Sequence, residues 1–227
     1  METIDDRISP TSTIADKKGI EYGDFEAIIV GGGDFPTHPL PLRLMQEAKH
    51  VVCCDGAANE FLVRDLHPWR VVGDCDSLSP ESAKAFSDIV RRNPDQETND
   101  QTKAVKFLLE RGIRHIAIVG ATGKRDDHTL GNIALLAEYR RMGADVRSYT
   151  DYGVFVPCSG ESHFECVRGA QVSIFNISAK NLTSKGLSYP IYDFTQWWQG
   201  TLNEAPEGEF SISAEGDYLV YVTYESK

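Results

Sequence analysis

The sequence predicts an α/β unit followed by an all-β unit, because the spacing of its apolar residues changes once along the chain. From residue 25 to about residue 152, continuous apolar runs alternate with segments of helical periodicity, which is typical of a mainly parallel sheet covered on both faces. Beyond that point apolar and polar residues alternate as in half-buried strands. We therefore expect an α/β domain at residues 25–152 and an all-β sandwich domain at residues 153–227, after a polar extension at residues 1–24.

Four apolar runs and five helical patterns define the α/β unit. The expected strands are Glu26–Val30, His50–Cys54, Arg70–Gly73 and His115–Val119. The expected helices are about Leu40–Ala48, Ala57–Val63, Pro80–Val90, Thr102–Arg111 and Thr129–Arg141. On the last helix, Leu130, Ile133, Ala134 and Ala137 share one face at helical spacing. This order of elements predicts a Rossmann-like sheet.

Alternating segments define the all-β unit. The expected strands are His163–Val167, Gln171–Asn176, Glu209–Ala214 and Asp217–Tyr224. Between the last two, Glu215-Gly216-Asp217 has the composition of a hairpin turn.

Composition favours a soluble cytoplasmic enzyme. The net charge is −11, which disfavours nucleic acid or an anionic membrane as the main partner. No apolar run reaches the roughly 18–20 residues of a membrane span, and the polar N-terminus lacks the order of a signal peptide. The five cysteines are odd in number and lack CxxC spacing, which predicts reduced thiols.

Asp55 follows the strand that ends at Cys54, and the small residues Gly56 and Ala57 let a helix begin close by. Ligands of open α/β sheets bind outside the carboxyl ends of the strands. Helix capping by Asp55 is the alternative that the residues leave open.

Asp74 and Asp76 follow the next strand and lie two residues apart. In an extended backbone both carboxylates would leave on the same side. Mg²⁺ prefers oxygen ligands and combines one or two carboxylates with substrate phosphates. A solvated surface turn is the alternative.

Asp100 and Lys103 lie at the start of a predicted helix that Asn99 or Thr98 can cap. The helix dipole favours a carboxylate in the first turn, and Lys103 shares the face of Asp100 three residues on. An ion pair with a purely structural role would explain this arrangement equally.

The segment Gly120–Gly123 connects an apolar strand to a helix, so its backbone N–H groups can approach phosphate oxygens. Arg125 adds a cation, and Asp127 and His128 follow at the helix start. His128 either supplies a hydrogen bond at that helix start or acts directly in catalysis.

The glycine loop Gly31–Gly33 also follows a strand, but Pro36 stands where a dinucleotide fingerprint needs its last glycine. A redox enzyme is therefore disfavoured, although Gly32 lies at the right edge to approach ATP. His163 and Cys166 are expected to be strand residues rather than metal ligands. The pair Trp197-Trp198 is assigned to the core or to an interface, with a stacking surface as the alternative.

Four segments resemble thiamine pyrophosphokinases in order and spacing: Cys54–Asn59, Val72–Leu78, Asp95–Ala104 and Gly120–His128. In the all-β unit, Thr183–Tyr189 and Leu202–Glu204 resemble the family's TxGLKY/W and Ser-Asn-Glu segments. The chain departs from the family pattern at Leu202, where the family has Ser, so one expected hydroxyl contact is missing. It also departs at Lys124, where a second Gly is usual, and this change either adds a cation facing the phosphates or costs the loop some flexibility.

The resemblance implies that a diphosphate moves from ATP to the hydroxyl of thiamine, giving thiamine diphosphate and AMP, in a Mg²⁺-dependent homodimer. The implied metal ligands are Asp74, Asp76 and Asp100. The implied catalytic residues are Asp74, Asp76, Asp100, Arg125 and Asp127. The implied ATP-binding residues are Gly32, Asp55, Gly56, Lys103, Gly120, Thr122, Gly123, Lys124 and Arg125. The implied thiamine-binding residues are Gln96, Asp127, His128, Tyr189 and Asn203.

Two alternatives remain at this stage. A pterin pyrophosphokinase would share the α/β site, but the Gly186–Tyr189 and Asn203-Glu204 segments count against it. A non-catalytic nucleotide sensor would have little use for three metal-facing carboxylates beside Arg125.

Overall fold

The computed structural model describes residues 13–14 and 25–227. The strands are β1 (Thr13–Ile14), β2 (Ala27–Val30), β3 (His50–Cys54), β4 (Arg70–Gly73), β5 (Val90–Arg92), β6 (His115–Val119), β7 (Asp145–Tyr149), β8 (Gly153–Glu165), β9 (Ala170–Asn176), β10 (Lys180–Lys185), β11 (Asn203–Ala205) and β12 (Glu209–Ser226). The helices are α1 (Pro39–Glu47), α2 (Ala57–Val63), α3 (Pro80–Ala85), α4 (Asp100–Leu109) and α5 (Asp126–Arg141), with a 3-10 helix, η1, at Trp197–Gly200.

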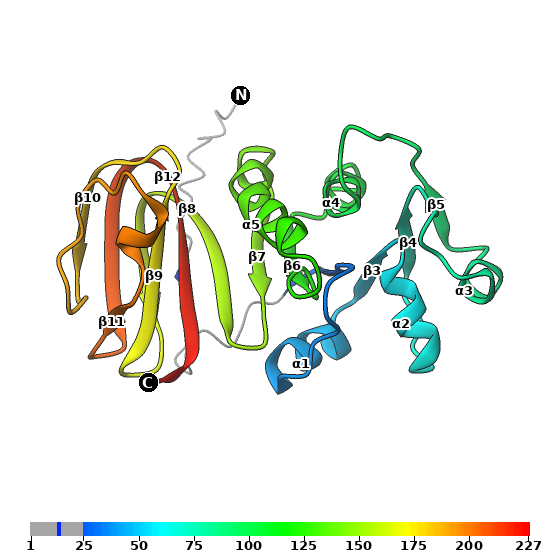
Figure 1. The fold of residues 1–227 in the computed structure, drawn as a ribbon, viewed down its shortest axis with the longest axis horizontal. Coiled ribbons are helices and arrows are strands. Elements are labelled where there is room, and N and C mark those ends of the chain that lie inside the picture. The colour runs from blue at the N-terminus through cyan, green and yellow to red at the C-terminus, as the bar shows by residue number, and fades with distance from the viewer. Residues whose placement is uncertain (1–12, 15–24) are drawn as a thin grey trace, which may run out of the picture.

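One mixed sheet runs through the described residues in the order β11-β9-β12-β8-β7-β6-β2-β3-β4-β5 (Figure 1). The strands from β5 to β7 pair in parallel, and from β7 to β11 the pairing is antiparallel. Beside this order, β1 pairs with β8 in parallel and β10 pairs with β12 in antiparallel fashion. The α/β half and the β half are therefore joined by backbone hydrogen bonds between β7 and β8. The expected α/β unit followed by β structure is present within this one sheet.

Each face of the parallel half is covered because its strands are apolar on both sides. On β2, Ile28 and Val30 pack into the cluster that contains α1 and α2, while Ala27 and Ile29 pack into the cluster that contains α4 and α5. All four residues are at most 1% exposed. Continuous apolar runs of this kind are stable only under helices on both faces.

The helix expected at Pro80–Val90 is wrong in its second half. α3 ends at Ala85, and Val90–Arg92 form β5, which pairs in parallel with β4. Phe86 is buried at the end of α3, and the β-branched Val90 suits an extended edge strand.

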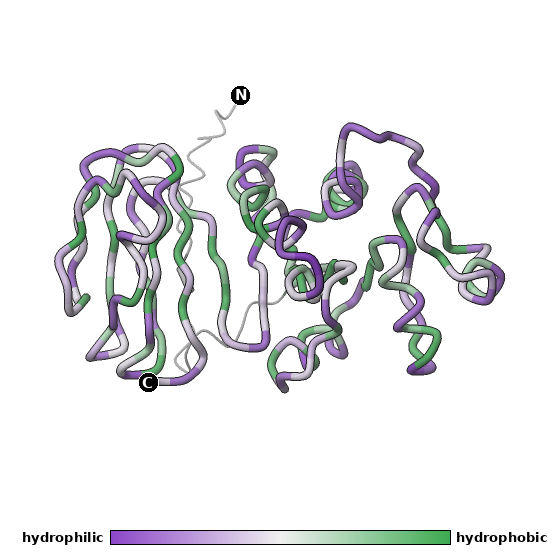
Figure 2. The backbone as a smooth tube through the Cα atoms, in the orientation of Figure 1, coloured by the Kyte–Doolittle hydropathy of each residue, from purple (hydrophilic) through white to green (hydrophobic). Residues whose placement is uncertain are grey.

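α5 begins three residues earlier than predicted and buries a different face. Leu136, Ala137 and Tyr139 are buried, whereas Leu130 is 54% exposed. Only the second half of this helix packs on the sheet, which leaves its hydrophilic first turns at the sheet edge. Figure 2 shows the hydrophilic loop that leads into α5.

The hairpin expected at Glu215-Gly216-Asp217 is also wrong, because β12 continues through it as one strand of 18 residues. Its register shifts between Ser213 and Asp217 in the pairing with β8, and Gly216 takes a φ of 99°. A bulge of this kind bends a strand without ending it. The first part of β12 pairs with β10 and the second with β9, so the strand changes neighbour at the bend.

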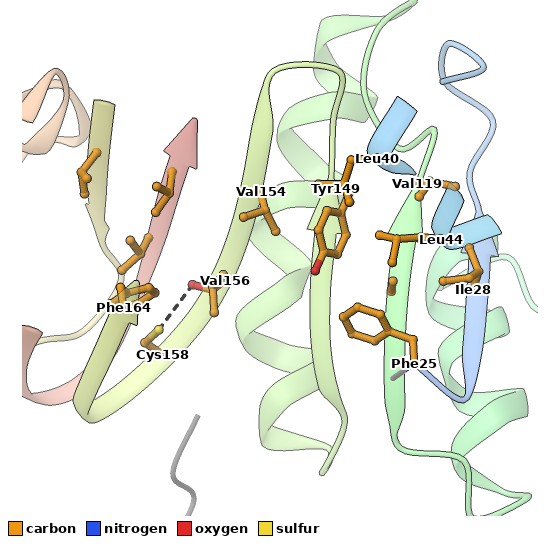
Figure 3. Close-up of a cluster of buried hydrophobic side chains, with 14 of the residues drawn as sticks. Phe25, Ile28, Leu40, Leu44, Val119, Tyr149, Val154, Val156, Cys158 and Phe164 are labelled. Carbon is orange, nitrogen blue, oxygen red and sulfur yellow. Dashed lines mark hydrogen bonds between the residues drawn. The ribbon is translucent and has the colours of Figure 1, made fainter. Parts of the chain in front are cut away.

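The buried cluster on one face spans the junction of the two halves (Figure 3). Phe25 and Tyr149 of the α/β half lie beside Val154 and Val156 of β8, and Phe164 continues the same cluster further along β8. The two halves therefore share a core as well as a sheet.

Two carboxylates make contacts that tie elements distant in sequence together, one within the α/β half and one between the two halves. Asp151, in the turn between β7 and β8, accepts hydrogen bonds from the backbone of Thr37 (2.9 and 3.1 Å) and His38 (3.1 Å). Asp217, at the bend of β12, forms a salt bridge with Arg141 of α5, with 2.6 Å between Oδ2 and Nη2. Among the described residues, no helix combines the length and the apolar character that a membrane span requires.

Candidate active site

Three carboxylates meet at the carboxyl ends of β3 and β4. One oxygen from each of Asp55, Asp74 and Asp76 lies within 4.8 Å of the others. The parallel pairing of β3 with β4 brings the loops that follow them to the same edge. Gly73 makes this approach possible, because a Cβ there would lie 2.7 Å from the Cβ of Asp55.

Asp55 has an energetically unfavourable backbone conformation and environment. It is 2% exposed, its φ of 34° is in the left-handed region, and its Oδ1 is buried without a hydrogen-bond partner among the described residues. Its Oδ2 accepts the backbone N–H of Ser77 at 3.2 Å. Burial, together with the neighbouring Asp100 and Asp74 carboxylates, raises the pKa of Asp55 to about 6. An unsatisfied buried carboxylate oxygen of this kind is suited to receive a cation.

Asp74 and Asp76 converge through a turn, and the expectation of extended backbone between them is wrong. Cys75 takes a φ of 70°, and the N–H of Asp76 donates to Oδ1 of Asp74 at 3.3 Å. Asn59 of α2 secures this loop, since its amide donates to the carbonyl of Ser77 (2.9 Å) and accepts from the N–H of Ser79 (3.0 Å).

Lys103 is the buried cation of the site. Its side chain is 2% exposed, and its Nζ lies 2.9 Å from Oδ1 of Asp100 and 3.6 Å from Oδ2 of Asp74. Burial opposes the charged form, but the two carboxylates outweigh it and raise the pKa of Lys103. Asn99 caps this helix by accepting the N–H of Thr102. The site thus holds one buried ammonium and the four carboxyl groups of Asp55, Asp74, Asp76 and Asp100. Acidic groups therefore outnumber the buried cation.

Gln96 joins the same cluster, because its Nε2 donates to Oδ2 of Asp74 at 3.1 Å. Desolvation opposes ionisation of Asp74, but hydrogen bonds from the Asp76 backbone and Gln96, with the charge of Lys103, lower the pKa of Asp74 overall. Asp74 is therefore ionised while Asp55 titrates near neutrality. Gln96, which the sequence assigns to the thiamine site, therefore lies beside the Asp74 carboxylate.

Two glycine loops lie against each other beside this cluster. Gly31, Gly33 and Asp34 donate backbone hydrogen bonds of 2.7–2.8 Å to the carbonyls of Val119, Gly120 and Thr122. A Cβ on Gly33 would lie 2.1 Å from the carbonyl oxygen of Thr122, so only glycine permits this approach. Gly32, between the two close contacts, has open space above its Cα.

The second loop ends in two exposed cations. Lys124 donates from Nζ to the carbonyl of Gly32 at 3.0 Å. Arg125 holds both carboxylate oxygens of Asp127, at 3.0 Å from Nε and 2.5 Å from Nη2. This fork of hydrogen bonds lowers the pKa of Asp127 to about 2, so Asp127 is a weak base while Arg125 remains in place. His128 is exposed on the first turn of α5.

Two residues of the β half are expected to bind thiamine, and they differ in exposure: the ring of Tyr189 is exposed, whereas Asn203 is buried and hydrogen-bonded to the Tyr189 backbone. Tyr189 is 63% exposed. Asn203 is 6% exposed, and its amide accepts from the N–H of Tyr189 (3.0 Å) and donates to its carbonyl (2.9 Å). Asn203 also accepts the N–H of Glu204 at 2.9 Å. The Asn203 side chain is thus engaged with backbone and positions the Tyr189 segment.

Neither tryptophan of η1 belongs to the core. Trp197 is 51% exposed and Trp198 is 72% exposed, with Leu202 (73%) close by in sequence. The assignment of the pair to the core is therefore wrong, and both an interface and a stacking surface remain as alternatives. Leu202 takes a φ of 63°, which is unusual for a branched side chain.

Sequence reasoning missed the residues that act at long range. Asp151 reaches Thr37 across 114 positions, and Asn132 of α5 links the amide of Asn99 (2.9 Å) to the carbonyl of Ala121 (2.9 Å). Each is an ordinary polar residue in its own segment. No local signal marks them, because their partners are defined only by the folded sheet.

A carboxylate cluster with a buried lysine lies beside two glycine loops at the carboxyl edge of a parallel sheet, the edge at which open α/β sheets bind ligands. The comparisons with known proteins identify the class further. Residues 42–147 match the family model "Thiamin pyrophosphokinase, catalytic domain", and residues 153–221 match "Thiamin pyrophosphokinase, substrate-binding domain". This chain belongs to the thiamine pyrophosphokinase family.

Relatives and solved structures agree with that assignment. The chain is 30% identical over 210 residues to thiamine pyrophosphokinase 1 of Oryza sativa subsp. japonica, covering 78% of this chain and 79% of the relative. Thiamin pyrophosphokinase from Geobacillus thermodenitrificans is 26% identical, with a TM-score of 0.71 over 88% of this chain and 98% of that one. The enzyme from Bacillus subtilis shares the fold, with a TM-score of 0.72 at 22% identity over 87% of this chain and 97% of that one.

Proposed function

We propose that this chain transfers the terminal diphosphate of ATP to the hydroxyl of thiamine, giving thiamine diphosphate and AMP. The observation that carries the proposal is the cluster of Asp55, Asp74 and Asp76 beside buried Lys103. Family membership supplies the substrates, and the carboxylate cluster supplies a place for the reacting phosphates. The chain is accordingly an ATP:thiamine diphosphotransferase of thiamine diphosphate biosynthesis.

Mg²⁺ fits the donor set of this site. The three carboxylates repel one another without a cation, and the buried Oδ1 of Asp55 lacks a partner among the described residues. Asp74 and Asp76 would hold the ion, with Asp55 completing the group. When bound, Mg²⁺ would neutralise charge on the transferred diphosphate. A direct metal contact from Asp100 stays a prediction, since its described partner is Lys103.

The chain's own residues then position the reactants. Lys103 is fixed between Asp100 and Asp74, where its ammonium offsets negative charge. The glycine loops offer backbone N–H groups, and Arg125 lies at their end. Diphosphate transfer depends mainly on alignment and electrostatics, so the protein need supply little covalent chemistry.

Asp127 is the protein group proposed to receive the proton of the thiamine hydroxyl. Its pKa of about 2 is set mainly by the hydrogen bonds from Arg125. If Arg125 turns to the phosphates, that carboxylate loses the partner that lowers its pKa and becomes a stronger base. Gln96 and His128 are proposed to border the acceptor side of the same site.

Thiamine is proposed to bind across a homodimer. Tyr189 offers an exposed aromatic face that suits a cationic thiazolium or a flat pyrimidine. Trp197, Trp198 and Leu202 leave a neighbouring apolar surface that a second copy of the chain would cover. We propose a cytoplasmic location on the net charge of −11 and the unpaired cysteines.

The alternatives are disfavoured. A pterin pyrophosphokinase would need a different acceptor site, but the family model for the substrate-binding domain of thiamin pyrophosphokinases matches residues 153–221. A non-catalytic nucleotide sensor does not account for that acceptor domain either.

The test is an assay of the purified chain with Mg-ATP and thiamine, read by product mass. We expect thiamine diphosphate and AMP in equal amounts, and no product when Mg²⁺ is chelated. Formation of ADP, or ATP binding without thiamine-dependent turnover, would refute the proposal.

A further inference from the structure

Lys124 has an unusual backbone for a residue with a side chain. Its φ is 54°, in the left-handed region where only glycine is free of steric cost. Gly120 and Gly123 in the same loop also have positive φ and are glycines. Because the side chain of Lys124 is exposed, burial in a core does not offset this strain. The side chain of Lys124 bridges the two glycine loops, because its Nζ donates to the carbonyl of Gly32.

The cations near the site differ in what holds them. Lys103 is buried between two carboxylates, and Arg125 is held by both oxygens of Asp127. Lys124 donates to a neutral carbonyl at the surface. A hydrogen bond to a carboxylate is roughly twice as strong as one to a neutral acceptor. Lys124 is therefore less costly to move than Lys103 or Arg125. Arg92, whose Nε donates to the carbonyl of Asp74 at 3.1 Å, is likewise held by a neutral acceptor, but the described residues show no hydrogen bond from it to the glycine loops.

The position of its acceptor connects Lys124 to the substrate. Gly31 and Gly33 are closed against the second loop, where a Cβ would lie 2.7 Å and 2.1 Å from carbonyl oxygens. Gly32 between them has open space. A polyphosphate can approach the backbone at Gly32, and an ammonium 3.0 Å from its carbonyl lies beside that opening.

We propose that Lys124 is a mobile positioning cation: it bridges the two glycine loops at Gly32 in the free protein and transfers to a phosphate oxygen when ATP binds. The inference rests on the proposed function, which supplies the nucleotide. The strained backbone places the ammonium beside this opening.

Three variants separate the charge from the strain. Lys124→Met keeps the length and the backbone strain but removes the ammonium. Lys124→Gly removes both, and Lys124→Arg keeps a cation. Lys49→Met, on an exposed residue that follows α1, is the control for losing one positive charge from an acidic protein.

In steady-state assays with Mg-ATP and thiamine, Lys124→Met and Lys124→Gly should raise the KM for ATP about tenfold. The KM for thiamine should stay unchanged, and Lys124→Arg should recover most of the loss. The KM for ATP should also depend less steeply on salt in Lys124→Met than in the wild type. In thermal unfolding, Lys124→Gly should gain about 2–4 °C, whereas Lys124→Met should gain nothing.

A KM for ATP and a salt dependence in Lys124→Met equal to those of the wild type and of Lys49→Met would overturn the inference while leaving the proposed function intact. Loss of ATP affinity in Lys124→Gly alone would assign the effect to the backbone and also overturn it. If the wild type shows no diphosphate transfer, the proposed function fails separately. Calorimetric Kd values for Mg-ATP with the same variants then decide the role of Lys124.

Discussion

The carboxylate edge of the α/β half and the β half are stabilised in opposite ways. At the edge, Asp55, Cys75 and Lys124 all take left-handed backbone conformations, and Asp55 keeps an unpartnered buried oxygen. In the β half, β12 pairs with β8 along most of its length. The aromatic side chains of Tyr189, Trp197 and Trp198 remain exposed on this half. Left-handed backbone also occurs at Asn181 and Leu202 of the β half, but among the described residues the edge alone combines it with a buried, unpartnered carboxylate oxygen. The exposed apolar side chains of the β half lie where thiamine or a second copy of the chain is proposed to bind.

The largest effect is expected from the edge. Asp74→Asn and Asp76→Asn keep the size of each side chain but remove charge from the carboxylate cluster that is proposed to hold Mg²⁺. Each should lower kcat at least about 10²-fold, on the scale of losing a key electrostatic group, with the fold unchanged by circular dichroism.

Asp88→Asn is the matched control, since Asp88 is an exposed carboxylate outside the cluster. It should retain wild-type turnover. Near-normal kcat in both Asp74→Asn and Asp76→Asn would remove these residues from the metal site.

Asp55→Asn should separate activity from stability. Asparagine tolerates the left-handed backbone, and turnover should fall because a site carboxylate is lost. Burial, with the neighbouring carboxylates, raises the pKa of Asp55 in the folded protein to about 6, above its unfolded value of about 3.9. The folded state therefore binds the proton more tightly, and ionised Asp55 destabilises the metal-free fold.

The stability difference should follow pH accordingly. In chelator, Asp55→Asn should exceed the wild type by up to about 3 kcal/mol at pH 8. The difference should shrink as pH falls through about 6 and vanish below about 4. The free energy of unfolding of each protein is measured with urea. A difference between Asp55→Asn and the wild type that does not change with pH would show that folding does not raise the pKa of Asp55.

The sequence predicted the elements of the edge well because each depends on its own residues. The apolar runs at His50–Cys54 and His115–Val119 became β3 and β6 without change, and Asn99 caps the helix that carries Asp100 and Lys103. Strand ends and caps are local, so the carboxylates that follow them were found together.

What the sequence could not supply depends on neighbours far along the chain. β12 continues through Glu215-Gly216-Asp217, because β8 continues beside it and a bulge absorbs the bend. The convergence of Asp74 and Asp76 needs the left-handed Cys75 rather than extended backbone. The contact of Asp151 with Thr37 exists only because the turn after β7 meets the loop after β2.

A smaller effect is expected in the β half. Tyr189→Ala should raise the KM for thiamine about tenfold, since it removes an exposed ring proposed to face the cationic thiazolium, with little change in the KM for ATP. Tyr189→Phe keeps the ring and should stay close to the wild type. An ATP defect with thiamine kinetics unaffected would place Tyr189 outside the acceptor site.

Asn203→Ala tests the support of that ring. Asn203 fixes the backbone of Tyr189 through two hydrogen bonds, so its loss should raise the KM for thiamine and also lower stability by about 1–3 kcal/mol. Wild-type thermal stability in Asn203→Ala would contradict the positioning role.

The smallest effect on the α/β site is expected from Trp198→Ser. This exposed residue should matter for association, so the variant should dissociate at higher protein concentration than the wild type in sedimentation experiments. At concentrations where it remains dimeric, kcat should be unchanged. A wild type that is monomeric and fully active would remove the shared-site proposal.

The fate of labelled phosphate tests the central claim most directly. ATP labelled at the α position and ATP labelled at the γ position are each incubated with the chain, Mg²⁺ and thiamine, and the products are separated. We predict that the γ label appears in thiamine diphosphate and the α label in AMP, in equal amounts. Recovery of the α label in ADP, or of the γ label only as inorganic phosphate, would contradict diphosphate transfer at this site.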